Sequence, residues 1–326
     1  MSRTIVFGLG AIGGVIAARL VQANRSVVGI ARGAHGEAVR DHGLTLETPE
    51  GSSRVDLRVV DHPSRLTIGL DDVVVLAVKS QQTDVAVDAL RTSAPASTPV
   101  VCAQNGVENE RRCLRSFERV YGVTVMCPAV HLSPGVVQAY SSPIPGLLDI
   151  GLAPSGLDDV ALHVRDEFVA AGFDSIARDD IMRWKYAKLL MNLGNAVEAV
   201  CGPDARSGPI MGLLRAEGAA CLAAAGIDVA SEQEDATRRG DLLQLHPING
   251  ERRRGGSTWQ SVQRGTGDVE TDFLNGEIVM LGRLHGVPTP ANALLQRHAR
   301  EVAVNGLPPG SIPEEQLLAE WRLVTQ

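Results

Sequence analysis

The segment Gly8-Leu9-Gly10-Ala11-Ile12-Gly13 constrains this chain more than any other, because its glycines have the spacing G-x-G-x-x-G. It follows the apolar run Ile5-Val6-Phe7 and opens the alanine-rich, helix-like stretch 11–23. A strand, a glycine turn and a helix in this order predict a dinucleotide-binding turn. Its first glycine permits the tight turn, the second lets the backbone approach a pyrophosphate, and the third lets the helix pack closely. The helix N-terminus then favours the negative phosphates.

The residue after the second predicted strand indicates which dinucleotide is bound. A site for NAD places Asp or Glu about 20 residues after the glycine turn, where it accepts a hydrogen bond from the ribose 2′-hydroxyl. Here the strand 26–31 has no acid at its end, and Arg32 follows. A guanidinium at this position pairs with the 2′-phosphate of NADP. We therefore predict NADP (NADPH) as the cofactor; the alternative is that Arg32 is one more solvated arginine.

Length and composition predict an ordinary globular protein of two domains. Of 326 residues, 44% are hydrophobic and only 3% aromatic, so the core must rest on Ala, Val, Leu and Ile. The net charge of −7 argues against a nucleic-acid partner. No apolar run reaches the about 18 residues of a membrane span, and we see no signal peptide, so we expect a cytoplasmic protein without a membrane partner. The five widely spaced cysteines predict reduced thiols rather than a disulfide frame or a metal site.

Strands and helices alternate through the first half of the chain, which predicts a doubly wound α/β domain. Residues 44–48 and 54–59 flank Pro49-Glu50-Gly51 and alternate in polarity, so they predict a β-hairpin. The strands expected to build the main sheet are 5–7, 26–31, 72–78, 100–103, 119–125, 136–140 and 147–151, with a further short strand at 173–176. The helices expected beside them are 36–42, 81–91 and 157–171.

From residue 179 onward helical patterns dominate, so we expect a mainly helical second domain. The stretch 231–256 is polar and rich in arginine, and we expect it to cover a surface or to frame a cleft. Pro313-Glu314-Glu315 starts a last helix. The longer helices are predicted at 179–200, 210–225, 268–285 and 291–304.

Two apolar strands end in polar segments, Val78-Lys79-Ser80-Gln81-Gln82-Thr83 and Ala103-Gln104-Asn105-Gly106-Val107-Glu108. In open α/β sheets ligands bind beyond the carboxyl ends of the strands. Both segments fall on the edge where the glycine turn puts a cofactor, so they are candidates for cofactor or substrate binding. The alternative is that these strand ends are polar for solubility alone.

A lysine and two asparagines lie on one face of the predicted helix 179–200. Lys188, Asn192 and Asn195 have the spacing i, i+4 and i+7 in a largely apolar segment. Burying such a face is costly unless it lines a wet or ligand-filled cleft. Burial also lowers the pKa of a lysine, which makes it a capable general acid. A solvated stripe on a core helix is the alternative, and Lys185, on a different face, is the competing lysine.

Together these residues resemble the ketopantoate reductases (2-dehydropantoate 2-reductases). The match runs in order to about residue 305, through the glycine turn, Arg32, Val78-Lys79, Gln104-Asn105-Gly106, Lys188-Leu189-Leu190-Met191-Asn192, Ser257-Thr258-Trp259-Gln260, Glu270-x-x-x-x-Asn275-Gly276 and His285-Gly286-Val287-Pro288. The resemblance implies a Rossmann-type NADP-binding domain at 1–178 and a mainly helical domain for substrate binding and dimerisation at 179–326. It implies NADPH-dependent reduction of a 2-oxo acid to a 2-hydroxy acid, with ketopantoate as the expected substrate and a homodimer as the expected assembly.

The resemblance also implies roles for individual residues. Lys188 would protonate the alkoxide that forms at C2 of the substrate as hydride arrives from the nicotinamide. Asn105 would lie between cofactor and substrate, and Glu270 would bind or orient the substrate hydroxyls. Without the resemblance, the position of Glu270 favours a solvated acid near a helix N-terminus. The remaining matched residues are Asn192, Asn195 and Ser257 on the substrate side and Arg32 and Lys79 on the cofactor side.

The chain departs from the family pattern only on the substrate side. The second asparagine of the family's helix often aligns with Ala196 here, next to Asn195. The interval from Ser257 to Glu270 is slightly longer than expected, and the stretch 231–256 can reshape the pocket mouth. The alternatives are therefore a related hydroxyacid or opine-type dehydrogenase with another substrate, and a non-catalytic NADPH-binding redox sensor. A sensor has no need of the combination of Lys188, Asn192 and Glu270.

Overall fold

The computed structural model of the chain describes residues 3–265 and 267–325. Its contacts divide the chain into two units, Met1–Lys185 with Ser231–Arg253, and Tyr186–Ala230 with Arg254–Gln326. The first unit thus includes residues 231–253, most of the polar stretch 231–256 that was predicted to belong to the second domain. The functional division of the chain at residue 178 stays a prediction.

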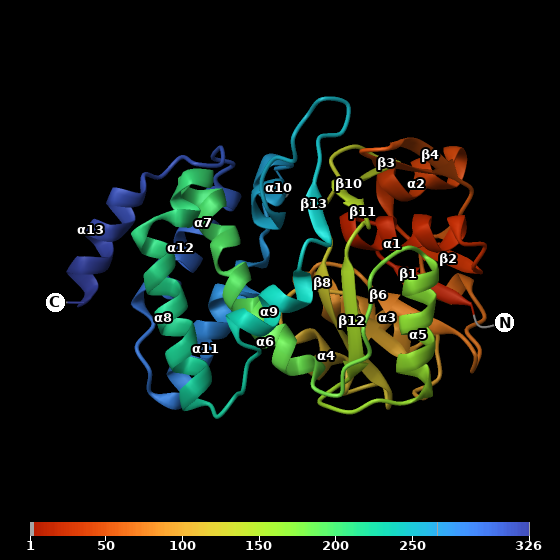
Figure 1. Cartoon of the computed structure of the whole chain (residues 1–326), viewed down its shortest axis with the longest axis horizontal. Coiled ribbons are helices and arrows are strands. Elements are labelled where there is room, and N and C mark those ends of the chain that lie inside the picture. The colour runs from red at the N-terminus through yellow and green to blue at the C-terminus, as the bar shows by residue number, and fades with distance from the viewer. Residues whose placement is uncertain (1–2, 266, 326) are drawn as a thin grey trace. The chain divides into compact units, whose positions relative to one another are not determined.

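The first unit is built on a seven-stranded sheet with the strand order β12-β8-β7-β6-β1-β2-β5 (Figure 1). Its strands are β1 (Thr4–Phe7), β2 (Val27–Ile30), β5 (Arg58–Val60), β6 (Val73–Leu76), β7 (Val100–Cys102), β8 (Val120–Met126) and β12 (Leu147–Leu152). Neighbouring strands pair in parallel, except that β12 is antiparallel to β8. This is the doubly wound α/β fold that the sequence predicts.

Helices cover both faces of this sheet, because side chains that alternate along its strands enter two separate apolar cores. On β1, Val6 packs with α1 (Ala11–Gln22) and α5 (Asp159–Ala170). Its neighbour Ile5 packs with α3 (Thr83–Arg91) and α4 (Asn109–Cys113) on the other face. The helix α2 (Gly33–His42) follows β2 and adds Val39 to the first core.

A second sheet, of order β4-β3-β10-β9, lies in the same unit. Its strands are β3 (Leu44–Thr48), β4 (Gly51–Val55), β9 (Ala129–Val130) and β10 (Val136–Ala139). The antiparallel pairing of β3 with β4 confirms the predicted hairpin. The predicted second strand 54–59 is wrong, because β4 ends at Val55 and residues 58–60 form β5, which pairs with β2.

Two other predicted strands differ from the structure. Residues 136–140 do not extend the main sheet; β10 pairs with β3 and β9, and its alternating burial suits a sheet packed on one face. Residues 173–176 do not form a strand, although isolated parallel bridges at Asp174 and Ala177 pair this segment with Leu147 and Ile150. The reason is local, because the backbone N–H of Ile176 donates to the side chain of Asp149 rather than to a strand carbonyl.

Helices form the regular structure described for the second unit, as the sequence predicts (Figure 1). They are α6 (Ile181–Asn192), which begins in the first unit, α7 (Gly194–Cys201), η3 (Pro203–Ser207), α8 (Pro209–Ala224), α10 (Ser257–Gln263), η4 (Glu270–Phe273), α11 (Asn275–His285), α12 (Pro290–Val304) and α13 (Glu314–Thr325). Two long predicted helices are each divided. The helix 179–200 is broken at Leu193, before a weakly helix-forming glycine, and 268–285 at Leu274, whose φ of −117° and ψ of −85° are not helical.

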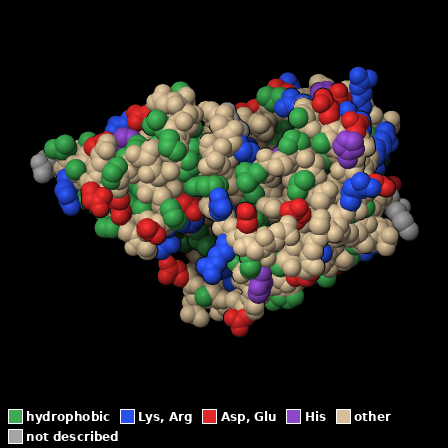
Figure 2. All heavy atoms as spheres, turned by 90° about the horizontal axis from the view of Figure 1, so that it is seen from above, with side chains coloured by type: hydrophobic (Ala, Val, Ile, Leu, Met, Phe, Trp, Pro, Cys, Tyr) green, Lys and Arg blue, Asp and Glu red, His purple; other side chains and the backbone are tan. Residues whose placement is uncertain are grey.

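Charged side chains of both signs are interspersed on the face seen in Figure 2. Among residues 3–265 and 267–325, no helix is both long enough and apolar enough to cross a membrane.

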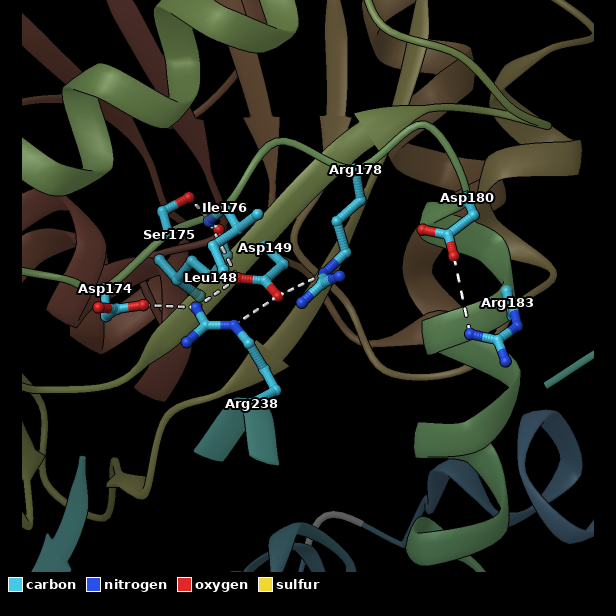
Figure 3. Close-up of polar contacts among 9 residues, drawn as sticks. All are labelled: Leu148, Asp149, Asp174, Ser175, Ile176, Arg178, Asp180, Arg183 and Arg238. Carbon is cyan, nitrogen blue, oxygen red and sulfur yellow. Dashed lines mark hydrogen bonds and ion pairs between the residues drawn. The ribbon is translucent and has the colours of Figure 1, made fainter. Parts of the chain in front are cut away.

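The stretch 231–253 is held on the first unit by ion pairs (Figure 3). It contains α9 (Glu232–Arg239) and β13 (Leu243–Leu245), which pairs with β11 (Ser141–Pro143). From α9, Arg238 donates to both carboxylate oxygens of Asp149 at 2.6 and 2.8 Å, and it also pairs with Asp174. Asp149 belongs to the edge strand β12, so this polar stretch covers a surface, which is one of the two roles expected from its composition.

We predict that Arg238→Ala destabilises the protein far more than Arg239→Ala. The Arg238 side chain is 7% exposed, and its removal leaves the buried carboxylate of Asp149 with Arg178 as its remaining ion-pair partner, which costs about 1–3 kcal/mol. The Arg239 side chain is 39% exposed and pairs within its own helix with Asp235, which is worth about 0.3–0.5 kcal/mol. Urea unfolding of the two variants measures the difference, and equal losses would show that the buried pairs do not anchor this stretch.

Candidate functional site

Four adjacent parallel strands of the first unit end in one register row, which consists of Ile30, Phe7, Leu76 and Cys102. The predicted cofactor-side segments follow this row directly: Arg32, the glycine turn 8–13, Lys79 and Asn105. The structure therefore brings all of them to the carboxyl edge of one sheet. The glycine turn lies where β1 and β6 meet, and there the strand order reverses, which is the usual ligand position in such sheets.

Each glycine of the turn has a separate structural reason. Gly8 has a φ of +98°, and a Cβ there would lie 2.9 Å from the backbone nitrogen of Val78. A Cβ on Gly13 would lie 1.9 Å from the carbonyl oxygen of Gly8, so α1 can pack on the turn only with glycine there. Above Gly10, in contrast, a Cβ would meet nothing within 4 Å, and this residue begins α1 without a side-chain cap. The open backbone and the helix N-terminus fit a pyrophosphate.

The two predicted cofactor-side cations lie on either side of this turn along the sheet edge. Arg32 is exposed and is the N-cap residue of α2, in extended geometry. Lys79 is partly buried and is the N-cap residue of η2 (Ser80–Gln82). Positive charges at these two places suit the phosphate groups of a dinucleotide.

A buried polar network joins the two strand-end segments behind this edge. The Asn109 side chain donates to the carbonyl oxygen of Asn105 at 3.0 Å and to Ser80 Oγ at 3.2 Å. It accepts from Thr83 Oγ1 at 2.8 Å, and Gln104 Nε2 donates to the same hydroxyl at 2.9 Å. The network fixes the backbone of Asn105. The sequence placed Thr83 at the end of the candidate segment 78–83 but gave no signal for Asn109, because a single polar residue without a spacing pattern gives no motif.

Lys185 forms a buried ion pair beside the same network. Its Nζ lies 2.8 Å from Glu110 Oε1, and the two side chains are 2% and 1% exposed. Nζ also donates to the carbonyl oxygens of Gln104 at 2.8 Å and Val123 at 3.2 Å. These three contacts match the three N–H donors of a lysine. Burial raises the pKa of Glu110, and the Lys185 ammonium opposes that shift.

This arrangement distinguishes the two lysines of α6. Lys185 has its donors committed to the first unit, so it no longer competes with Lys188 as a proton donor. Lys188 follows three residues later on the same helix, partly buried, in the part of α6 that belongs to the second unit. Three residues are slightly less than one helical turn, so Lys188 lies on the turn of α6 that follows Lys185.

The predicted substrate-side asparagines lie on two helices rather than one. Asn192 is the last residue of α6 and Asn195 is in the first turn of α7, so their spacing crosses the break at Leu193. Both side chains are buried. Asn195 Nδ2 lies 3.5 Å from the hydroxyl of Ser257, so the second unit brings together two of the residues predicted to bind substrate.

Glu198 of α7 holds the segment that precedes Ser257. Its carboxylate accepts from the backbone N–H of Gly256 at 2.8 Å and from Arg206 at 3.0 Å. The N-terminus of α10 is thus fixed against α7. Glu198 was not among the predicted site residues, although an acid three residues after Asn195 in an otherwise apolar helix is a signal that the sequence contains.

Glu270 is 5% exposed at the start of η4, which argues against the alternative of a solvated acid. Arg264 is its electrostatic neighbour: burial lowers the pKa of this guanidinium, and Glu270 opposes the shift. Asn275, the other polar residue of the same motif, is fully buried and donates to Asn292 at 3.1 Å. The contact gives Asn275 a structural role between α11 and α12.

The comparisons with known proteins match two family models. The ketopantoate reductase PanE/ApbA model matches residues 4–153, and the C-terminal model of the same family matches 180–303. The chain belongs to the ketopantoate reductase family. The match that begins at residue 180 includes the whole of α6, and it also includes the stretch 231–253 that is held on the first unit.

Individual relatives agree with this membership. A 2-dehydropantoate 2-reductase of Mesorhizobium japonicum is 31% identical over 334 residues, with 92% of this chain and 97% of that protein covered. The crystal structure of a PanE/ApbA family ketopantoate reductase from Ralstonia eutropha JMP134 has a TM-score of 0.78 at 28% identity and covers 93% and 99% of the two chains. A D-mandelate dehydrogenase bound to NADH and anilino(oxo)acetate has a TM-score of 0.79 at 20% identity over 93% and 99%, which shows a shared fold. The chain is thus an oxidoreductase of the ketopantoate reductase type.

We predict that Glu110→Ala strongly destabilises this reductase, because it leaves the Lys185 ammonium buried without its counterion. Breaking such a pair costs about 3–5 kcal/mol, whereas replacing both partners with apolar residues is close to neutral. Urea unfolding of Glu110→Ala and of the double variant Glu110→Leu/Lys185→Met measures both effects. The control is Glu108→Ala, whose partly exposed ion pairs are worth at most about 1 kcal/mol. A double variant as unstable as Glu110→Ala would contradict the ion-pair explanation.

Proposed function

We propose that this chain catalyses the NADPH-dependent reduction of a 2-oxo acid to a 2-hydroxy acid, with ketopantoate as substrate and pantoate as product. The observation that supports the proposal best is the row of strand ends in the first unit. There a glycine turn with an open backbone, two cations and Asn105 share one sheet edge, in a chain of the ketopantoate reductase family.

The cofactor side of the proposal rests on the fit between these residues and a dinucleotide phosphate. The N–H groups at the start of α1 would hold the pyrophosphate beside Gly10, and Arg32 would pair with the 2′-phosphate. Lys79 adds a second positive charge at the same edge. When bound, NADPH supplies the hydride that is transferred to C2 of the substrate.

The proton in this reaction comes from Lys188. As C2 gains a hydride, its carbonyl oxygen gains negative charge, and the Lys188 ammonium stabilises that charge and then donates a proton to the oxygen. The product is the 2-hydroxy acid, and the lysine is left neutral until it takes a proton from solvent. The contacts of Lys185, whose donors are all used, support the assignment of the proton donor to Lys188 rather than to Lys185.

The substrate itself is held by polar residues of the second unit. We assign Asn192, Asn195 and Ser257 to the polar groups of the 2-oxo acid, with Ser257 at its carboxylate end. Glu270 binds or orients the hydroxyl groups of ketopantoate. The 3.5 Å contact between Asn195 and Ser257 supports a shared role for these two residues.

The helical unit also has a feature that suits self-association. It exposes several large apolar side chains, among them Leu284, Val304, Leu323 and Val324. We propose a homodimer that pairs through this unit, which light scattering on the purified protein tests directly.

The assay that tests the proposed reaction follows the loss of NADPH absorbance with a panel of 2-oxo acids, including ketopantoate, pyruvate and phenylglyoxylate. Fastest turnover of ketopantoate supports the proposal. Preference for phenylglyoxylate instead indicates a related hydroxyacid dehydrogenase, the activity named for the structurally similar D-mandelate dehydrogenase. NADPH binding without turnover of any member would indicate a redox sensor and contradict the proposal.

We predict that Lys188→Ala lowers kcat by about 10²-fold or more, the usual scale for a positioned proton donor. Binding of NADPH should remain nearly unchanged, because the cofactor contacts belong to the first unit. Steady-state kinetics and fluorescence titration with NADPH measure the two effects separately. An unaltered kcat would remove Lys188 from the mechanism.

We also predict that Arg32→Ala weakens NADPH binding far more than NADH binding, because only NADPH has the 2′-phosphate that the guanidinium pairs with. Fluorescence titration with both cofactors measures the two dissociation constants. Arg40→Ala is the matched control, since Arg40 is an exposed arginine near the other end of the same helix. Equal losses for NADPH and NADH in Arg32→Ala would contradict the cofactor assignment.

A further inference from the structure

His35 of α2 makes two hydrogen bonds to backbone groups far away in the sequence. Its Nε2 lies 2.8 Å from the carbonyl oxygen of Leu9, in the glycine turn, and its Nδ1 lies 2.9 Å from the backbone nitrogen of Gly135. A backbone N–H can only donate and a carbonyl oxygen can only accept, so Nδ1 accepts and Nε2 donates. The two bonds therefore select the neutral imidazole with its proton on Nε2.

The surroundings of His35 suit this neutral form. Its ring packs against the ring of His131, with the centroids 4.1 Å apart and the planes at 56°. Burial lowers the pKa of His35, and the bond to Leu9 opposes that shift. The positively charged form of His35 is thus disfavoured beside the glycine turn.

Leu9 is held from two directions. Its side chain is 1% exposed and packs on β2, where a Cβ on Gly29 would lie 2.6 Å from Leu9 Cδ1. Its carbonyl oxygen accepts from His35. The middle of the dinucleotide turn is consequently fixed both to β2 and to the helix that follows β2.

The same helix begins with Arg32. Arg32 is the N-cap residue of α2 and His35 lies in the first turn of that helix. His35 is thus a direct link between the turn assigned to the pyrophosphate and the residue assigned to the 2′-phosphate. One NADPH molecule has to satisfy both places together, so its affinity depends on the spacing between them. A bidentate guanidinium–phosphate contact tolerates little displacement.

We propose that His35 is a positioning residue that holds Arg32 in register with the glycine turn and thereby favours NADPH over NADH. The inference rests on the proposed function, since it assumes a dinucleotide on this turn. The inference gives His35 a role in cofactor specificity, although neither the pyrophosphate nor the 2′-phosphate is assigned to this residue. Loss of His35 removes the tie between the two phosphate-binding segments while both segments keep their own residues.

Four variants test this role. His35→Ala removes both hydrogen bonds. In His35→Gln the amide nitrogen replaces Nε2 and keeps the bond to Leu9, and in His35→Asn the amide oxygen replaces Nδ1 and keeps the bond to Gly135. His42→Asn is the matched control, because His42 is exposed in the last turn of the same helix. Dissociation constants for NADPH and NADH are measured by fluorescence titration at about pH 7.5. Urea unfolding of each variant shows whether the substitution also changes stability.

We expect His35→Ala to weaken NADPH by about tenfold and NADH by much less, with His35→Gln restoring most of the preference and His35→Asn restoring less. In the wild-type protein, ¹H–¹⁵N spectra of the imidazole should show the proton on Nε2. If His35→Ala fails to fold, the cofactor preferences of His35→Gln and His35→Asn test the specificity role instead.

Two results overturn the inference, and they are distinguishable. If the wild type prefers NADPH and every His35 variant keeps that preference, His35 has no specificity role, while the proposed function stands. If the wild type itself binds NADPH and NADH equally, the assignment of Arg32 and the role of His35 fail together.

Discussion

One buried ammonium group organises the part of this molecule on which the proposed chemistry depends. Lys185 faces a carboxylate and two backbone carbonyl oxygens, and these belong to the strand-end turn after β7, to α4 and to β8. Burying both charges is unfavourable unless each has its partner. Removal of either charged group therefore leaves the other one buried without a counterion. The ion pair therefore ties the start of α6 to the edge of the parallel sheet where the cofactor-side residues gather.

The two neighbouring lysines of α6 therefore differ in role. Lys185 is committed to structure, and its burial excludes it from contact with a substrate. Lys188, on the next turn, belongs to the second unit together with the Asn195–Ser257 contact. A proton donor needs a rigid support as well as the right residue type, since a small misplacement reduces the rate. A helix anchored one turn earlier provides such support.

Sequence patterns predicted the parts of the fold that depend on local rules. The glycine turn, the fully apolar β6 and the polar ends of β6 and β7 were enough to place a dinucleotide edge, because parallel strands in register bring their carboxyl ends together. The patterns failed where tertiary contacts decide. Residues 136–140 have strand character, but their one-sided burial assigns them to the second sheet, and Asp149 takes the backbone donor that a strand at 173–176 needs.

The residues that support the site were the hardest to predict. His35, Asn109 and Glu110 belong to no spacing pattern, and most of their partners are remote in sequence, with Gly135 lying 100 residues from His35. A buried polar residue is informative only once its partner is known. The motif residues are the basis of the proposed chemistry, whereas these supporting contacts become visible only in the folded chain.

The most direct measurement is a crystal structure of the protein with NADPH and an unreactive 2-oxo acid analogue. We predict that Lys188 Nζ lies at hydrogen-bond distance, about 3 Å, from the oxygen on C2 of the analogue. A Lys188 side chain directed into bulk water, with another group donating to that oxygen, would contradict it.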